Sequence, residues 1–119
     1  MYAAARKIDN LTAIIDYNHQ QIDGTIESVL DPGDLRAKFE AFGWKVLEAD
    51  GNAMVSVLEV LNNAKAESGK SKPVVILNHT HMGFGVDYMF DNHEWHGSAP
   101  NDEQAQRALE QLEETLGDY

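Results

Sequence analysis

The sequence predicts an α/β fold in which helices cover both faces of a parallel, doubly wound sheet, giving three α/β/α layers. Three short aliphatic runs, at residues 11–18, 45–50 and 72–80, are typical of strands. Helical patterns separate these runs, and a further one follows the last. The alternation favours a single domain over residues 1–119, with its functional loops at the carboxyl ends of the strands.

The first and last strands are the most apolar segments of the chain. "LTAIIDYN" (11–18) and "KPVVILNHT" (72–80) are nearly continuous in aliphatic and β-branched residues. Parallel strands covered on both faces have this composition. "KVLEAD" (45–50) is the strand between them in sequence, and "MYAAARKIDN" has the character of the last turns of a helix.

Two helices are predicted between the strands. "DPGDLRAKFEAFG" (31–43) begins with an Asp cap and a Pro in its first turn, and it ends at Gly43. Its apolar residues lie on one stripe, formed by Leu35, Phe39 and Phe42. The second helix, "NAMVSVLEVLNNAKAESG" (52–69), also ends in glycine. Its apolar residues at helical spacing are Met54, Val57, Leu58 and Leu61.

A last helix is predicted from about Asn101. Its apolar residues should face inward, and they are Ala105, Ala108, Leu109 and Leu112. The acidic residues of this segment indicate a solvated helix face, and they are Asp102, Glu103, Glu110, Glu113, Glu114 and Asp118. A patch for a basic partner is the alternative interpretation.

Three strands make a thin sheet for this fold. The chain also begins abruptly, with only the end of a helix before the first strand. We therefore expect an incomplete domain whose first half lies elsewhere.

The composition excludes several classes of function. Nine Lys and Arg against twenty Asp and Glu give a net charge of −11, so no basic stripe is available for nucleic acid. Without cysteine there is neither a disulfide framework nor a thiolate metal site. No apolar run approaches the length of a membrane span, and the N-terminus is too polar for a secretory signal. We expect a cytoplasmic protein without nucleic-acid or membrane partners.

The turn after the first strand, "DYNHQQIDG" (16–24), is one candidate site. Asn18 places an amide oxygen at a strand end, and the turn exposes backbone carbonyls. Hard cations such as Mg²⁺ bind oxygen ligands of this kind. Taken alone, Asn and Gly are more often plain turn residues.

Four of the five histidines follow the third strand and form a second candidate site. His79 and His81 share a strand face, and His93 and His96 at i, i+3 could complete a zinc site. Against zinc, no carboxylate spacing matches a metal-dependent hydrolase. Structural hydrogen bonding is the more frequent role of such histidines.

The Gly-x-Gly turn at residues 83–85 permits positive φ and close approach of the backbone to a ligand. It follows a strand but opens no helix, so a dinucleotide site is disfavoured. No G-x-S-x-G motif is present, and nothing indicates a covalent serine or cysteine mechanism.

Three segments together resemble the thiamine-diphosphate-binding domain of transketolase. "AARKIDNLTAIIDYNHQQIDG" is similar to the family stretch "NL..I.D.N..Q.DG", and "KFEAFGWKVLEADGNAM" to "F.AFGW.V.E.DG". "KPVVILNHTHMGFGVDYMFDNHEWHGSAPNDEQAQRAL" resembles "KP..I...T..G.GV.FM.....WHG.APN.E....AL". The three occur in order, at the family's spacing, over essentially the whole chain.

The resemblance assigns roles position by position. It makes the Asn18 side chain and the Gln20 main-chain carbonyl ligands of Mg²⁺ (or Ca²⁺). It packs Ile22 and Met82 against thiamine diphosphate. It brings His96, in "WHG", to the diphosphate and the sugar phosphate, where an imidazole can donate a hydrogen bond and transfer a proton. The other four histidines receive no role.

The chain also departs from the family pattern. The family motif opens with Gly-Asp-Gly about thirty residues before the metal-binding Asn, but only seventeen residues precede Asn18 and none form that motif. The pyrimidine domain, whose glutamate activates the cofactor ring, is missing as well. The resemblance therefore implies partner chains that supply these parts, or self-association over the exposed strand edge.

Two classes of function follow from these features. The leading one is a transketolase subunit or fragment, inactive alone, that transfers a two-carbon ketol unit between sugar phosphates. The rival is a non-catalytic scaffold that keeps the fold. A small zinc protein built on the histidines is a third possibility.

Overall fold

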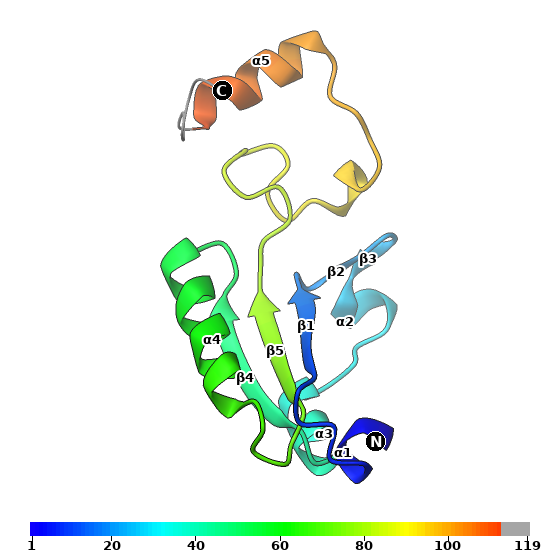
Figure 1. Ribbon diagram of the computed structural model, residues 1–119. Coiled ribbons are helices and arrows are strands. Elements are labelled where there is room, and N and C mark those ends of the chain that lie inside the picture. The colour runs from blue at the N-terminus through cyan, green and yellow to red at the C-terminus, as the bar shows by residue number, and fades with distance from the viewer. Residues whose placement is uncertain (113–119) are drawn as a thin grey trace.

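The computed structural model of the protein describes residues 1–112 and contains the expected parallel sheet (Figure 1). Its strands are β1 (Thr12–Tyr17), β4 (Lys45–Asp50) and β5 (Val74–His79). β5 lies between the other two, in the order β1-β5-β4, and both pairings are parallel. The α/β prediction with a parallel sheet is therefore confirmed.

Helices α3 (Leu35–Ala41) and α4 (Met54–Glu67) cover opposite faces of the sheet. Val60 and Ala64 of α4 are buried in one cluster with Ile76. On the other face, α3 packs its apolar side chains against the buried residues Val46, Val75 and Leu77. The three-layer arrangement follows from these two clusters. The short helix α1 (Tyr2–Ala5) precedes the sheet, as the sequence predicted.

The start of α3 differs from the prediction. Asp34 caps the helix by accepting a hydrogen bond from the Ala37 N–H at 2.8 Å. Asp31 instead holds a turn, in which its carboxylate accepts from the Gly33 N–H at 2.7 Å. The Asp-Pro-Gly sequence therefore forms a turn before the helix. In this Asx turn, the Asp31 carboxylate binds a backbone N–H two residues on and does not cap the helix. Gly43, with φ of 88°, ends the segment as predicted.

The prediction that β1 is covered on both faces is wrong. β5 is buried throughout its apolar part, but exposure alternates along β1, and Ile14 is 59% exposed. Ile14 lies beside the buried Ile76 in register, but α4 packs on β4 and β5. The face of β1 that carries Thr12, Ile14 and Asp16 is therefore open in residues 1–112.

The apolar stripe predicted for α4 forms its buried face only in part. Val57 is half-buried, but Met54, Leu58 and Leu61 are exposed, and the helix packs on the sheet through Val60 and Ala64. The helix is apolar around most of its circumference, and its smaller residues allow the closest approach to the sheet. Phe42 of α3 is likewise exposed at the end of its helix.

The segment after β1 folds into elements that the sequence did not predict. β2 (Gln20–Gln21) and β3 (Gly24–Thr25) pair antiparallel, and the one-turn helix α2 (Ile26–Val29) follows them. These elements are too short to show a periodic pattern. Buried Ile26 anchors the segment.

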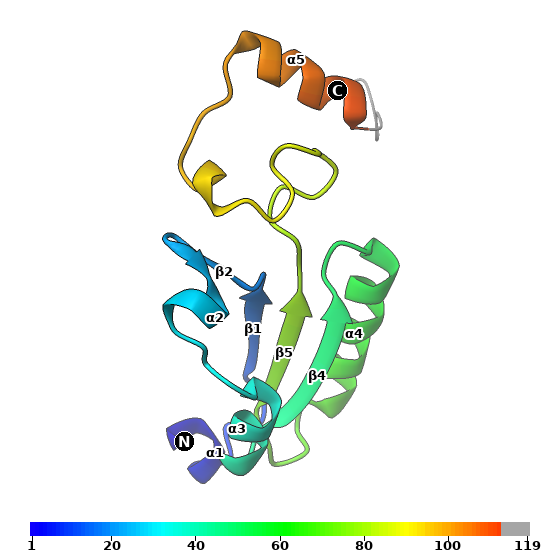
Figure 2. The same ribbon diagram turned by 180° about the vertical axis from the view of Figure 1, so that it is seen from behind.

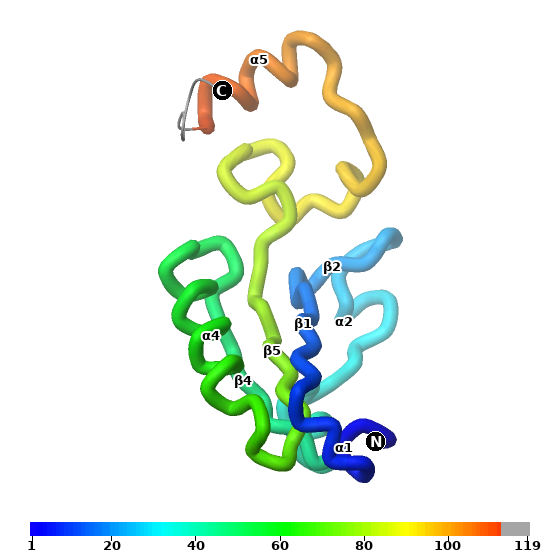
Figure 3. The backbone as a smooth tube through the Cα atoms, viewed as in Figure 1, coloured from blue at the N-terminus to red at the C-terminus, as the bar shows by residue number. Residues whose placement is uncertain are grey.

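The chain beyond β5 extends away from the sheet (Figures 2 and 3). It contains the 3-10 turn η1 (His93–Trp95) and helix α5 (Asp102–Gln111). Asn101 and Gln104 form a capping box at the start of α5. The Tyr88 hydroxyl donates to the Gln104 carbonyl at 2.6 Å and ties the helix to the loop after β5.

The predicted inward face of α5 is only partly correct. Ala105 and Ala108 are half-buried, but Leu109 and Leu112 are exposed because the helix packs on a loop and not on the sheet. The acidic Asp102, Glu103 and Glu110 are exposed, as a solvated face requires. Glu113, Glu114 and Asp118 lie outside the described residues. Over residues 1–112, no helix has the length and apolarity needed to cross a bilayer.

Ile76 and Ile14 provide a matched test of the core. They have the same side chain, lie in register on one face of the sheet and differ in burial. We expect Ile76→Ala to lower the free energy of unfolding by about 2–5 kcal/mol. Ile14→Ala should cost less than about 1 kcal/mol, because its side chain is mostly solvated. Urea unfolding curves measure both, and equal losses would contradict the observed burial.

Candidate functional site

Polar side chains gather where the three parallel strands end. Asp16 of β1 is in register with Asn78 of β5, and Asp50 of β4 with His79. The Thr80 hydroxyl donates to the Asp16 carboxylate and links the ends of β1 and β5. Ligands of open parallel sheets bind outside these carboxyl ends.

Asn18 and Gln20 lie together in the turn after β1. The Asn18 Oδ1 accepts a hydrogen bond from the Gln20 N–H at 2.9 Å. His19 between them has φ of 57°, a left-handed conformation that is uncommon for residues other than glycine. The Gln20 Oε1 is buried and has no hydrogen-bond partner within residues 1–112. A buried acceptor without a donor is costly, and a cation or a donor from outside would satisfy it.

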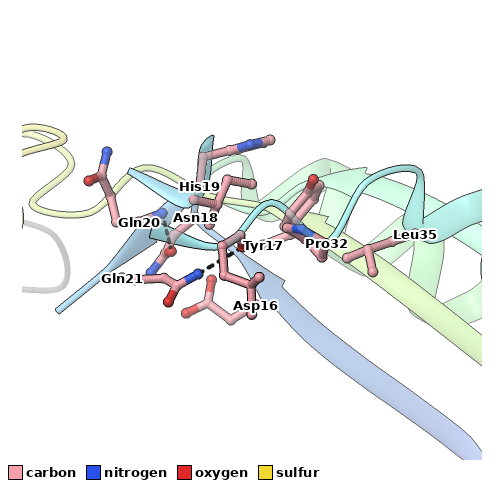
Figure 4. Close-up of a pocket in the computed structure, with 10 residues that line it drawn as sticks. Asp16, Tyr17, Asn18, His19, Gln20, Gln21, Pro32 and Leu35 are labelled. Atoms are coloured by element: carbon pink, nitrogen blue, oxygen red, sulfur yellow. Dashed lines mark hydrogen bonds between the residues drawn. The ribbon is translucent and has the colours of Figure 1, made fainter. Parts of the chain in front are cut away.

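A cavity of about 270 Å³ opens beside this turn (Figure 4). Its polar wall includes Asp16, Asn18 and Gln20, and its apolar wall includes Ile26 and Leu35. Both walls come from the segment between β1 and α3, so the turn and the short elements after it shape the cavity.

These residues fit part of a divalent-cation site. Asn18 and Gln20 offer neutral oxygens of the kind that hard cations bind, but Mg²⁺ sites normally include a carboxylate. The nearby Asp16 carboxylate is occupied by Thr80. Within residues 1–112, no three His, Cys, Asp or Glu side chains are close enough to hold a metal ion. A complete site therefore needs at least one more ligand.

Ile22 and Met82 occupy different parts of this end of the molecule. Ile22 lies at the tip of the β2–β3 hairpin and is 69% exposed. Met82 is half-buried, and its carbonyl accepts from the Asp91 N–H at 2.8 Å. The described contacts do not join the two side chains.

The Gly83 turn approaches its own chain closely. A Cβ at this position would lie 2.5 Å from the Met89 backbone, and φ is 66°. The expectation that this glycine leaves room for a ligand is therefore not supported at Gly83, because Met89 fills that space. Only glycine fits, since a side chain would both clash and strain the backbone.

The four clustered histidines do not act as one group. His79 Nε2 lies 3.2 Å from the Glu48 carboxylate, and His81 Nδ1 lies 3.0 Å from that of Asp91. His93 is in η1, and His96 is exposed in the loop beyond it. The zinc alternative therefore finds no support in the geometry of residues 1–112. The chain after β5 runs beyond the carboxyl ends of the strands (Figure 1). His96 directly follows η1 in this segment, and no described contact joins it to Asn18.

A charge network on the α3 face was not predicted from the sequence. Glu48 bridges Arg36, at 2.6 Å, and His79, and Arg36 also contacts Glu40 at 3.0 Å. The hydrogen bond from Arg36 is the main reason that the pKa of Glu48 lies below its ordinary value, and His79 adds to this effect. Glu48 raises the pKa of Arg36 in turn. The sequence shows only the Arg36–Glu40 pair, at i, i+4 within α3, because Glu48 and His79 lie on two different strands.

A family model for the transketolase thiamine diphosphate binding domain matches residues 1–116. The chain belongs to the transketolase family. It is 37% identical over 110 residues to one of the subunits of apulose-4-phosphate transketolase from Phocaeicola vulgatus, an alignment that covers 92% of this chain and 38% of that protein. It is 33% identical over 113 residues to 6-deoxy-6-sulfo-D-fructose transketolase subunit SqwG of a Clostridium species, covering 95% of this chain and 40% of the relative.

Solved transketolases share the fold. The transketolase of Campylobacter jejuni superposes with a TM-score of 0.80 at 29% identity, over 92% of this chain and 17% of that chain. The resemblance to the family and the fold are therefore confirmed. The chain spans about 40% or less of the length of these relatives.

The Glu48 network predicts a pH dependence of stability. Because the folded pKa of Glu48 is lowered, its stabilising effect is complete above the unfolded value of about 4.5 and is lost as the pH falls below it. Glu48→Gln should therefore lose less stability than the wild-type chain between pH 5 and roughly pH 3. The effect should be modest, because both partners are more than one third exposed. Urea unfolding across this range measures it, and parallel curves for the two proteins would refute the assignment.

Proposed function

We propose that this chain is a subunit or fragment of a thiamine-diphosphate-dependent transketolase that transfers a two-carbon ketol unit between sugar phosphates. The carrying observation is the position of the Asn18–Gln20 turn at a strand end of a thiamine diphosphate binding domain. The buried Gln20 side-chain oxygen in this turn has no partner in residues 1–112, which indicates that a group from outside these residues binds here. When bound, the cofactor would supply the carbanion chemistry. The protein would bind, orient and exchange protons.

Individual residues would divide this work. The Asn18 side chain and the Gln20 carbonyl would bind Mg²⁺ (or Ca²⁺), and Ile22 and Met82 would pack against the cofactor. His96 would donate to the diphosphate and the sugar and transfer a proton. Its exposed position leaves the ring accessible to such ligands.

The activity would require partner chains. A carboxylate ligand for the metal and the domain that activates the cofactor ring would come from outside residues 1–112. Two relatives are named as subunits, one of apulose-4-phosphate transketolase and the other, SqwG, of 6-deoxy-6-sulfo-D-fructose transketolase. These names support a multi-chain enzyme acting on sugars that bear an anionic group.

The open edge of β1 offers a place for association. The carbonyls of Leu11 and Tyr17 point toward β5 and accept hydrogen bonds from the Val74 and Thr80 N–H groups, respectively. By alternation, the peptide groups of Thr12, Ile14 and Asp16 point away from β5, where residues 1–112 provide no strand. Another strand would satisfy these groups and would bring a helix over the exposed Ile14. Self-association is the alternative use of the same edge.

The scaffold function remains the second candidate. It is favoured by the incomplete metal ligand set and by the lack of a described contact between His96 and Asn18. A scaffold would keep the fold and the open edge, but it would not need the polar turn after β1.

Calorimetry distinguishes a partial cofactor site in the isolated chain from a complete one in the assembly. We expect the isolated chain to bind thiamine diphosphate with Mg²⁺ weakly or not at all, and the chain assembled with its partners to bind tightly. Asn18→Ala should weaken binding by the assembly, because it removes a metal ligand. Tight binding by the isolated chain would contradict the incomplete site. An assembly that does not bind thiamine diphosphate with Mg²⁺ would refute the proposed enzymatic function.

His96→Ala tests the enzyme against the scaffold. In an active assembly, loss of a proton-transferring imidazole should lower kcat about 10²- to 10⁴-fold. His93→Ala is the matched control, because it removes a nearby histidine from η1 to which no role is assigned. Turnover that is unchanged in His96→Ala would favour a structural role for this loop.

A further inference from the structure

His81 is held at both its ring and its main chain. Its Nδ1 faces both oxygens of the Asp91 carboxylate, at 3.0 and 3.2 Å. Its ring stacks on Phe90 with centroids 4.9 Å apart and an interplanar angle of 21°. Its backbone N–H donates to the Asn52 Oδ1 at 2.8 Å. Main chain and ring are thus fixed independently.

Asp91 is held in place by the loop that separates it from His81. The Asp91 N–H donates to the Met82 carbonyl and closes the loop, and the Gly83 turn packs on Met89 inside it. Asp91 itself has φ of 51°, a conformation that costs free energy for a residue other than glycine. The fold therefore maintains a strained residue that places a carboxylate on the Nδ1 of His81.

The other ring nitrogen is free to act on a ligand. Nε2 of His81 has no hydrogen-bond partner in residues 1–112, and the side chain is 53% exposed. A carboxylate on Nδ1 keeps the proton of the neutral ring on that nitrogen, so Nε2 presents a lone pair. His81 lies two residues past the end of β5, the central strand, and directly before Met82. This is the end of the sheet where ligands bind.

The charges around His81 favour a neutral donor over an anion. Carboxylates lie on the elements that meet here, namely Asp91 of the loop, Asp50 at the end of β4 and Asp16 at the end of β1. Arg107 of α5, which packs on the loop, is bound by Asp87 of the same loop. Residues 16–35, 46–64 and 73–106 contain no Lys or Arg. Arg36 is bound by Glu40 and Glu48. A phosphate would be repelled here, but a hydroxyl group can donate to Nε2.

We infer that His81 is a substrate-positioning residue whose Nε2 accepts a hydrogen bond from a sugar hydroxyl, with Asp91 fixing the ring. The inference rests on the proposed function and extends it to a second histidine, distinct from His96. Its consequence is weaker binding of the sugar phosphate when the Nε2 acceptor is removed.

The test uses three variants in the assembled enzyme. His81→Phe keeps a ring that can stack on Phe90 but removes the acceptor, and KM for the sugar phosphate should rise about three- to tenfold. His81→Gln places an amide near the position of Nε2, so it should recover most of this loss. His93→Phe, the matched control, should retain the wild-type KM.

A second measurement does not depend on turnover. In ¹⁵N spectra of the chain with labelled histidine, neutral His81 should carry its proton on Nδ1. A proton on Nε2 would overturn the inference, as would a wild-type KM in His81→Phe. A wild-type assembly without any turnover would instead refute the proposed function and this inference with it. An active assembly that is insensitive to His81 would refute the inference alone.

Discussion

The pairing of β5 with both of its neighbours is the constraint on which the rest of the structure depends. This strand is buried on both faces, and its register fixes the ends of β1 and β4 at one level. Because Tyr17 lies opposite His79, the turn that carries Asn18 begins where the segment leading to Met82 leaves the sheet. A shift of one residue in either pairing would turn these side chains to the opposite face. The site therefore owes its geometry to an apolar core rather than to its own polar contacts.

The sequence predicted the parts of the fold that depend on periodic apolar patterns. Three strands and three of the helices lie where those patterns occur, because burial of aliphatic side chains determines both. The prediction from sequence failed where the burial of a side chain depends on which neighbouring element covers it. The aliphatic composition of β1 and α4 predicts covered faces, but Ile14 and Leu58 are exposed in residues 1–112. The predicted start of α3 was also wrong, because Asp31 and Asp34 are equally good caps by residue type and only Asp34 caps the helix.

The candidate site was predictable in its positions but not in its contacts. Asn18 and Gln20 were located because a motif places them after a strand, and the structure brings them together. The bonds between Glu48 and His79 and between His81 and Asp91 join residues 31 and 10 positions apart through the fold. Such pairs have no sequence signal. The structure also separates the histidines that their spacing alone would group around one metal ion.

Exposure of the β1 edge and of the outer surface of α4 bears on how the chain persists in a cell. An unpaired strand edge beside exposed apolar side chains promotes aggregation, and chaperones and proteases act on proteins that do not reach a stable folded state. Copies that find no strand to pair with would be removed, and copies that find one would be protected. The amount of this protein would then follow the supply of whatever covers that edge. The level of expression alone would therefore reveal little about how much of the chain is paired with another strand.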